Sequence, residues 1–194
     1  MVAVIIGKIL MEPAKIRAMS AGVWVIDALL ASQECRALVR CASLAGFEDA
    51  HQRFAGRHNA EAFVENTDLA TRLEAELLSC GFHVDLDDLL EIYRYQDGEH
   101  ITSHADRGRT IRRQHQSNSA LLIYLSDDFE GGRTIFTGRG TAVRPSVGRA
   151  VLFEHGIVHA AEAVSEGVKY VARIDAHLNP VRRSAGAHRR TISR

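Results

Sequence analysis

The chain has 194 residues, and its 24 Lys and Arg residues balance its 24 Asp and Glu residues. This length allows one well-buried domain and is short for two of ordinary size. Because the charges balance, no overall field favours nucleic acid or an anionic membrane, so we expect neither as a partner and look for binding at a local site.

The first residues and the cysteines indicate where the protein resides. The apolar run Val2–Ile6 is too short for a secretory signal, and no stretch reaches the ~20 apolar residues that span a bilayer. Cys35, Cys41 and Cys80 form no short metal-ligand pair, and an odd number suits a reducing compartment. We therefore expect a soluble cytoplasmic protein. Its oligomeric state stays open, with a homodimer as one option.

Residues 1–85 are predicted to form a mainly helical support. A short strand at Val23–Ile26 precedes a helix from Gln33 to Ala45, which we expect the Ser32 hydroxyl to cap. A second helix is capped by Asn66 or Thr67 and ends near Gly81. The polar segment between the helices, 47–66, has no periodicity, which favours an exposed loop; a flap over a site is the alternative.

Residues 86–178 change to short apolar runs divided by turn residues. Such runs predict strands at Leu89–Tyr95, Ala120–Leu125, Thr134–Phe136, Ala142–Arg144, Arg149–Phe153 and Val168–Leu178. Many short strands after two helices indicate a mainly β domain with an antiparallel double sheet and the helices packed outside. Residues 179–194 are basic and almost free of apolar side chains, and they predict a frayed tail.

One candidate site lies within the predicted sheets. His104 and Asp106 are two residues apart, so on a strand their side chains would point the same way and could grip one ion. With His159 they would supply two imidazoles and one carboxylate, which can occupy one face of a six-coordinate iron and leave three positions open. A lone His-X-Asp is common by chance, and most histidines near an acid bind no metal.

The order of the motifs after His104 carries more information than any one of them. Tyr124 lies in an Ile-Tyr-Leu strand, a Phe-Glu-Gly-Gly-X-Thr-X-Phe segment follows from residue 129, and His159 precedes Val164, Gly167 and Lys169. Over roughly residues 86–178 this order resembles the catalytic domain of prolyl-4-hydroxylase-type oxygenases, which depend on Fe(II) and 2-oxoglutarate.

The resemblance implies a double-stranded β-helix, a cupin-like jelly roll, with the N-terminal helices packed on one sheet. It implies that His104, Asp106 and His159 bind the iron and that Lys169 binds the distal carboxylate of 2-oxoglutarate. Tyr124 could add a hydrogen bond to that carboxylate, and Tyr95 resembles an aromatic residue that lines the co-substrate pocket.

The implied reaction is hydroxylation of an unactivated C–H bond in a prolyl, peptidyl or free amino-acid-like substrate. O2 is consumed, succinate and CO2 are the co-products, and ascorbate is a candidate reductant. A small-molecule oxygenase of the same chemistry and a cupin-type metal protein without this activity are the alternatives. A binding module that touches nucleic acid through the basic tail is a further alternative.

Several roles have rival residues. His155 could replace His159, and His100 could replace His104, but neither preserves the spacing of the motif. Arg173 lies on the same strand face as Lys169 and could bind the distal carboxylate instead, or reach the substrate. The family has an aromatic residue near the end of this strand, and this chain does not.

The substrate side of the pocket is the least defined part. The basic loop from Arg107 to Asn118 follows Asp106 directly and is either a solvated lid or a clamp for a carboxylate-bearing substrate, because arginine forks match carboxylates. The substrate candidates are Arg57, Asn59, Arg107 and Arg109.

Overall fold

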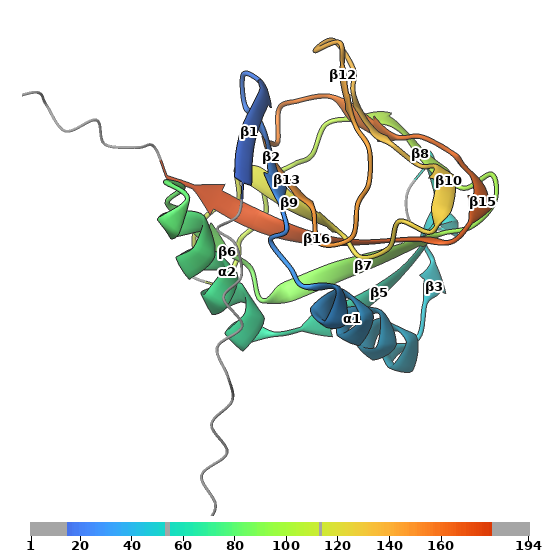
Figure 1. Cartoon of the computed structure of the whole chain (residues 1–194), viewed down its shortest axis with the longest axis horizontal. Helices are drawn as coiled ribbons and strands as arrows, with labels where there is room; N and C mark the ends of the chain where they lie inside the picture. The colour runs from blue at the N-terminus through green and yellow to red at the C-terminus, as the bar shows by residue number, and fades with distance from the viewer. Residues whose placement is uncertain (1–14, 53–54, 113, 180–194) are drawn as a thin grey trace, which may run out of the picture.

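A computed structural model describes residues 15–52, 55–112 and 114–179 (Figure 1). The elements, in chain order, are β1 (Lys15–Ser20), β2 (Val23–Asp27), α1 (Ser32–Ala45), β3 (Glu48–Asp49), the 3-10 helix η1 (Ala50–Gln52), β4 (Arg57–His58), β5 (Ala60–Glu65), α2 (Thr67–Ser79), β6 (Val84–Leu86), β7 (Leu89–Tyr95), β8 (His100–His104), β9 (Ser119–Tyr124), β10 (Phe129–Gly131), β11 (Thr134–Phe136), β12 (Thr141–Val143), β13 (Ala150–Glu154), β14 (His159–Ala161), β15 (Val164–Gly167) and β16 (Lys169–Leu178). The described chain is mainly β, as predicted.

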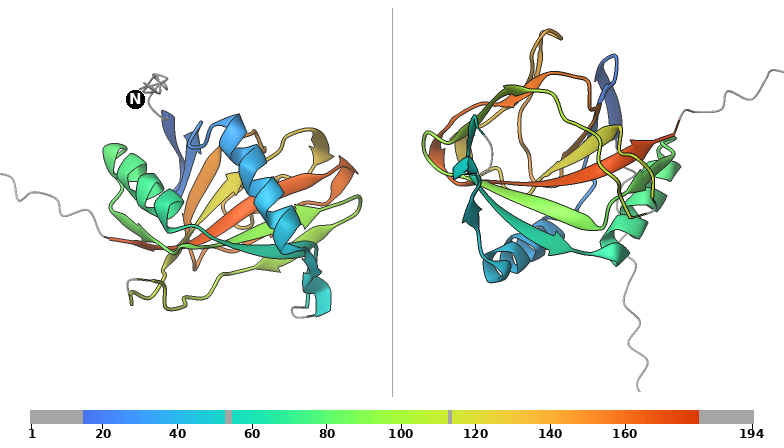
Figure 2. Two further views of the ribbon diagram at one scale, coloured as in Figure 1. Left: turned by 90° about the horizontal axis from the view of Figure 1, so that it is seen from below. Right: turned by 180° about the vertical axis from the view of Figure 1, so that it is seen from behind.

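Most strands belong to two antiparallel sheets that pack against each other. The large sheet runs in the order β1-β2-β13-β9-β16-β7-β5-β3, and β6 pairs with the end of β16. The small sheet runs in the order β12-β11-β14-β8-β4, and β10 pairs with β15 outside both sheets. This arrangement is the jelly roll that the sequence predicted, and both helices lie on the outer face of the large sheet (Figures 1 and 2).

The alternation of side chains along β16 divides the apolar core in two. Val171 belongs to the core between the two sheets, whereas Ala172 and Ile174 belong to the core under the helices. Lys169 and Arg173 share the face of Val171, so both project between the sheets. Any polar group on this face of β16 is therefore removed from water and must find a partner there.

The two helices present an apolar stripe to the large sheet. The buried helical residues recur at intervals of three or four positions, which places them on one face. They are Cys35, Leu38 and Ala42 of α1 and Ala70, Leu73 and Leu77 of α2. The helices thereby seal the outer face of the sheet whose inner face holds Lys169 and Arg173.

The starts of the two helices test the capping predictions. The Oδ1 atom of Asn66 accepts a hydrogen bond from the backbone N–H of Leu69 (2.9 Å), which confirms Asn66 as the cap of α2. The prediction that Ser32 caps α1 is wrong, because Ser32 is the first helical residue and Ala31 is the N-cap. The Glu34 carboxylate accepts from the backbone N–H of Ala31 (2.9 Å) and supplies the capping contact instead.

The prediction of an exposed loop over residues 47–66 is wrong. This segment contributes β5 to the large sheet and β4 to the small sheet, where β4 pairs with β8. The pattern was misleading because Glu61 and Phe63 share one face of β5, and there the acidic residue is buried while the aromatic residue is 40% exposed. The segment therefore borders β8, the strand that ends at His104.

The described residues between 15 and 85 are less helical than predicted, because β1 and β5 join the predicted strand β2 in the large sheet. The apolar run Val2–Ile6 and the basic residues Pro180–Arg194 lie outside the described part of the chain. Within the described residues, no helix combines the length and the apolar character needed to cross a membrane.

Candidate metal centre and adjoining cavities

Three potential metal ligands converge at one end of the small sheet. His104 closes β8 and His159 opens β14, and the two residues are direct cross-strand partners. One ligand atom from each histidine and one from Asp106 all lie within 4.8 Å of one another. In the described part of the chain, this is the one group of three such residues. Cross-strand register therefore brings together residues 55 positions apart in sequence.

Backbone carbonyls orient both imidazole rings. The Nδ1 atom of His104 lies 2.8 Å from the Thr102 carbonyl oxygen, and Nδ1 of His159 lies 3.0 Å from the Ile157 carbonyl oxygen. A carbonyl can only accept, so each Nδ1 carries the proton and each Nε2 presents its lone pair. Such second partners are the usual way in which metal-binding histidines are fixed.

Asp106 is not on a strand, in contrast to our expectation. Strand β8 ends at His104, and the loop that follows returns the carboxylate so that its Oδ1 lies 3.6 Å from Nε2 of His104. The side chain of Asp106 is only 4% exposed. Its position therefore depends on the loop and on the groups that hold it there.

The local charges act on the protonation of these groups. Burial by itself raises the pKa of Asp106, but the adjacent His104 and the charge of Arg173 outweigh it and hold the pKa well below its ordinary value. Burial lowers the pKa of His159, although Asp106 opposes this. An ionised carboxylate and a neutral imidazole are the forms that bind a metal.

The two rival histidines lie elsewhere. Nε2 of His155 is 3.3 Å from Oδ1 of Asp175, and its ring is buried. His100 stacks on His58 with ring centroids 4.6 Å apart. Neither residue belongs to the group of three ligands.

An inner cavity of about 30 Å³ extends from the two histidines between the sheets, and Lys169 lines it. The Lys169 side chain is 1% exposed, and Nζ donates to the Gly132 carbonyl oxygen (2.6 Å). Among the described residues no carboxylate lies within 4 Å of this ammonium group, although we expected it to be paired. Burial lowers the pKa of Lys169 to about 7, with a small opposing contribution from Glu162.

Two tyrosines surround the ammonium group. Nζ of Lys169 lies 4.7 Å from the centre of the Tyr95 ring and 5.9 Å from the centre of the Tyr124 ring. The Tyr124 hydroxyl donates to Oγ1 of Thr134 (2.7 Å), and Thr134 also lines the cavity. The ring faces stabilise the cation only weakly.

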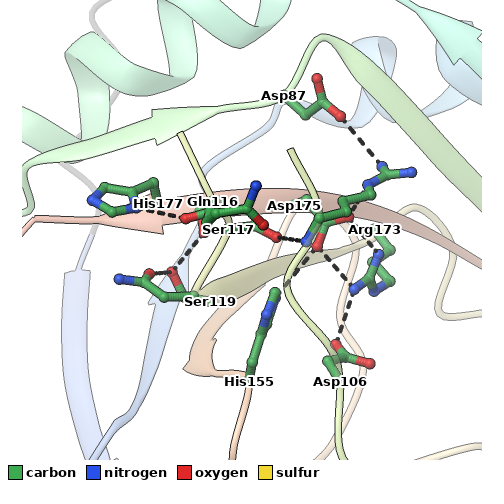
Figure 3. A network of polar contacts seen from close by, with 12 residues as sticks. Asp87, Asp106, Gln116, Ser117, Ser119, His155, Arg173, Asp175 and His177 are labelled. Carbon is green, nitrogen blue, oxygen red and sulfur yellow. Dashed lines mark hydrogen bonds and ion pairs between the residues drawn. The ribbon is translucent and has the colours of Figure 1, made fainter. Parts of the chain in front are cut away.

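Arg173 lies in a network of carboxylates (Figure 3). Its two terminal nitrogens contact both oxygens of Asp175 (3.0 and 3.2 Å), Oδ2 of Asp106 (3.1 Å) and Oε2 of Glu91 (3.3 Å). Only its Nε lacks a partner in the described part of the chain. Arg173 is therefore already neutralised, whereas Lys169 is not.

An outer cavity of about 520 Å³ opens on the other side of His104 and Asp106. Three of the predicted substrate residues, Arg57, Arg107 and Arg109, line it. Nη1 of Arg57 donates to the Tyr93 hydroxyl (3.0 Å), while Arg107 is exposed at the rim. Asn59 is buried with its amide on the Ala60 carbonyl (3.1 Å), and it lines neither of the two cavities.

Arg109 is bound within the protein. Its guanidinium pairs with Asp87 (3.3 Å), with Glu91 (3.2 Å) and with Asp175. Asp175 and Glu91 are parts of the site that our sequence reasoning missed. Asp175 could have been identified from the sequence, because residues two apart on a strand share a face and Arg173 was already a candidate. Glu91 comes from another strand, and no local pattern pointed to it.

Comparison with known proteins agrees with this geometry. Residues 90–174 match the model of the 2OG-Fe(II) oxygenase superfamily. No curated protein matches the sequence.

Solved structures share the fold. A viral collagen prolyl hydroxylase from Paramecium Bursaria Chlorella virus-1, in its 2OG complex, is 22% identical with a TM-score of 0.65, over 79% of this chain and 94% of that one. A Pseudomonas putida prolyl-4-hydroxylase is 17% identical with a TM-score of 0.60, over 82% of this chain and 94% of that one. A Trichoplax adhaerens prolyl hydroxylase bound to a hypoxia inducible factor peptide fragment is 15% identical with a TM-score of 0.59, over 80% of this chain and 83% of that one.

At these identities the solved structures establish the fold, and the superfamily match covers most of the two sheets. The description of that superfamily names Fe(II), 2-oxoglutarate (2OG) and an oxygenase activity. Residues 90–174 of this chain are therefore similar to the 2OG-Fe(II) oxygenase superfamily, and the chain shares the fold of the solved prolyl hydroxylases.

Proposed function

We propose that His104, Asp106 and His159 bind Fe(II) and that Lys169 binds the distal carboxylate of 2-oxoglutarate. The observation that carries this proposal is a buried ammonium group that has no carboxylate partner among the described residues, in a cavity that begins at two converging imidazoles. Two imidazoles and one carboxylate form the donor set that suits non-haem Fe(II) with open positions. When bound, the iron with 2-oxoglutarate and O2 supplies the oxidation of a C–H bond, and succinate and CO2 are released.

The chain's own groups bind and orient the reactants. Lys169 holds one end of the diacid, and a full ion pair there offsets the cost of burying its charge. The inner cavity is narrow, so 2-oxoglutarate must displace side chains to enter. Lys169 is a long side chain held by a single hydrogen bond to Gly132, and we expect it to move. The two sheets keep water away from this end.

The outer cavity is the proposed substrate site, because His104 and Asp106 form part of its wall. The substrate class we propose is a prolyl, peptidyl or free amino-acid-like compound. Structural neighbours with this fold are prolyl hydroxylases, one of them bound to a peptide. Arg107 at the rim is the arginine best placed to meet a substrate carboxylate, since Arg109 is engaged by three carboxylates.

The test is a turnover screen with Fe(II), ascorbate and 2-oxoglutarate against proline, other free amino acids and proline-containing peptides. Succinate release that depends on substrate, with a product heavier by one oxygen, is the expected result in one class. The variant His104→Ala should abolish it. An active wild type that oxidises none of these classes would contradict the substrate proposal. A wild type that forms no succinate and binds no divalent metal would contradict the proposed site.

A further inference from the structure

Arg173 contacts one oxygen of a proposed metal ligand and faces away from solvent. Its Nη2 lies 3.1 Å from Oδ2 of Asp106, while the other oxygen of that carboxylate, Oδ1, lies on the side of His104. We infer that Arg173 is a positioning residue which keeps Asp106 a ligand through Oδ1 alone. This inference rests on the proposed metal centre.

The rest of the network fixes Arg173 itself. Asp175 binds both of its terminal nitrogens (Figure 3). Glu91, on the neighbouring strand β7, binds Nη1. Asp175 is held in turn by Arg109 and by His155. Because β16 lies between β7 and β9 in the large sheet, the backbone of Arg173 is also fixed. The guanidinium therefore cannot follow Asp106 if the loop carrying that residue shifts.

The arrangement has a consequence for coordination. A carboxylate can bind an ion through one oxygen or through both, and the second mode uses one more coordination position. Three protein ligands leave three positions on a six-coordinate ion, which the keto acid and O2 together require. A charged hydrogen-bond donor on Oδ2 of Asp106 favours binding of the ion through Oδ1 alone. Arg173 thus keeps the third open position available.

The same contacts explain why the cation on β16 at position 173 does not serve the distal carboxylate. Its terminal nitrogens face the carboxylates of Asp106, Asp175 and Glu91, whereas Lys169, four residues earlier on the same face, contacts a carbonyl. Two cations on one strand face are thereby given different tasks by their partners.

The experiment measures Co2+ binding by calorimetry, with Co2+ as a redox-stable substitute for Fe(II). We expect Arg173→Gln to weaken Co2+ binding by about 10–100-fold, as loss of an outer partner usually does. Arg173→Lys, which keeps the charge, should restore part of the affinity. The matched control is Arg149→Gln, which removes a partly buried arginine that pairs with Asp27 away from the ligands and from the loop of Asp106. Its Co2+ affinity should equal that of the wild type.

A purely structural role of Arg173 predicts a different result: a lower melting temperature with unchanged Co2+ affinity, which would overturn the inference. Because Arg173→Gln leaves buried carboxylates unbalanced, the double variant Arg173→Met with Asp175→Asn removes one charge of each sign. It should also bind Co2+ weakly, and wild-type affinity in it would overturn the inference.

If neither variant folds, the wild-type crystal structure with Co2+ and 2-oxoglutarate decides. Asp106 bound through Oδ1, with Oδ2 on Arg173, supports the inference, and a carboxylate bound through both oxygens overturns it. A wild type that binds no Co2+ refutes the metal centre and the role of Arg173 together. A wild type that binds Co2+ as tightly as Arg173→Gln refutes the inference alone.

Discussion

Lys169 has an environment that disfavours its own charge. Its ammonium group is buried with one carbonyl and two aromatic faces, and its pKa falls to about 7 as a result of burial. In the unfolded chain the pKa is near the ordinary lysine value, so between about pH 7 and 10 the unfolded state binds the proton and the folded state does not. This group therefore makes the ligand-free protein more stable as the pH rises through that window.

The opposite pH dependence is expected for co-substrate binding. The 2-oxoglutarate dianion favours the protonated form of Lys169, so above pH 7 binding must take up a proton. The dissociation constant should then rise by up to about tenfold per pH unit. Calorimetry from about pH 6 to about pH 9 measures this, and Lys169→Arg is the control because an arginine keeps its proton. Equal slopes in both proteins would exclude Lys169 as the anchor.

Gly132 provides a second test at the scale of one residue. Its φ is +64°, and a Cβ atom there would lie 2.8 Å from Phe129 and 3.0 Å from Cδ of Lys169. We expect Gly132→Ala to displace Lys169 and weaken 2-oxoglutarate binding by about tenfold or more, in addition to about 1–2 kcal/mol of backbone strain.

Gly138 is a matched control for this substitution. Its φ is +78°, and a Cβ atom there would meet nothing within 4 Å. Gly138→Ala should show the same loss of stability in urea unfolding with unchanged 2-oxoglutarate affinity. If both variants weaken binding equally, the effect belongs to the strain and not to Lys169.

At the scale of elements, the loop between β8 and β9 is a fixed wall of the outer cavity. Arg109 ties its start to three carboxylates, and Arg112 ties its middle to Glu74 of α2 (2.8 Å) and to the Leu86 carbonyl (2.9 Å). The sequence left a solvated lid and a substrate clamp as the two options. Because Arg109 and Arg112 are bound to groups of the protein itself, their contacts favour neither a solvated lid nor a substrate clamp for these two residues.

Loosening this loop is therefore expected to cost stability. Arg112→Gln removes charged hydrogen bonds from a side chain that is only 16% exposed, which should cost about 1–3 kcal/mol. Hydrogen exchange followed by mass spectrometry should show faster exchange in residues 107–118 and unchanged exchange in the central strands β9 and β16. Unchanged exchange in the loop would mean that Arg112 does not hold it.

The strands differ in how far the sequence could predict them. Strands β7 and β11 were predicted with their observed bounds, because apolar runs between turn residues mark them. Strand β5 was missed because the acidic Glu61 is buried whereas Phe63, on the same face, is exposed, and β1 was missed because most of it is exposed. A strand can be predicted from sequence when its apolar residues are buried in a regular pattern, and strands near the edge of a sheet often lack such a pattern.

At the scale of the whole molecule, sequence order and spatial order coincide only in part. The spacing of His159, Gly167 and Lys169 was informative because one short continuous stretch of chain, from β14 to the start of β16, carries all three. The groups around Arg173 come from β7, from the loop after β8 and from β16, so their meeting depends on the sheet order. Such contacts between distant strands were beyond prediction from one sequence.

Metal and co-substrate should stabilise the whole fold, since they bind only the assembled site. At about a hundredfold excess over its dissociation constant, Co2+ should add about 2.7 kcal/mol and raise the melting temperature by about 5–10 °C. His104→Ala should abolish this shift. His100→Ala, which alters the rival histidine stacked on His58, should retain it. A shift lost only in His100→Ala would reassign the ligand.

The position of the single tryptophan determines what its emission can report. Trp24 lies on β2, packs edge-on against Phe82 (5.4 Å between ring centres), and faces the core under the helices, while its neighbours Val23 and Val25 face the core between the sheets. The fluorescence of Trp24 should therefore not change when a ligand binds in the inner cavity, and it should change when the helices separate from the large sheet. It offers an optical signal for denaturation that ligands in the pocket do not quench.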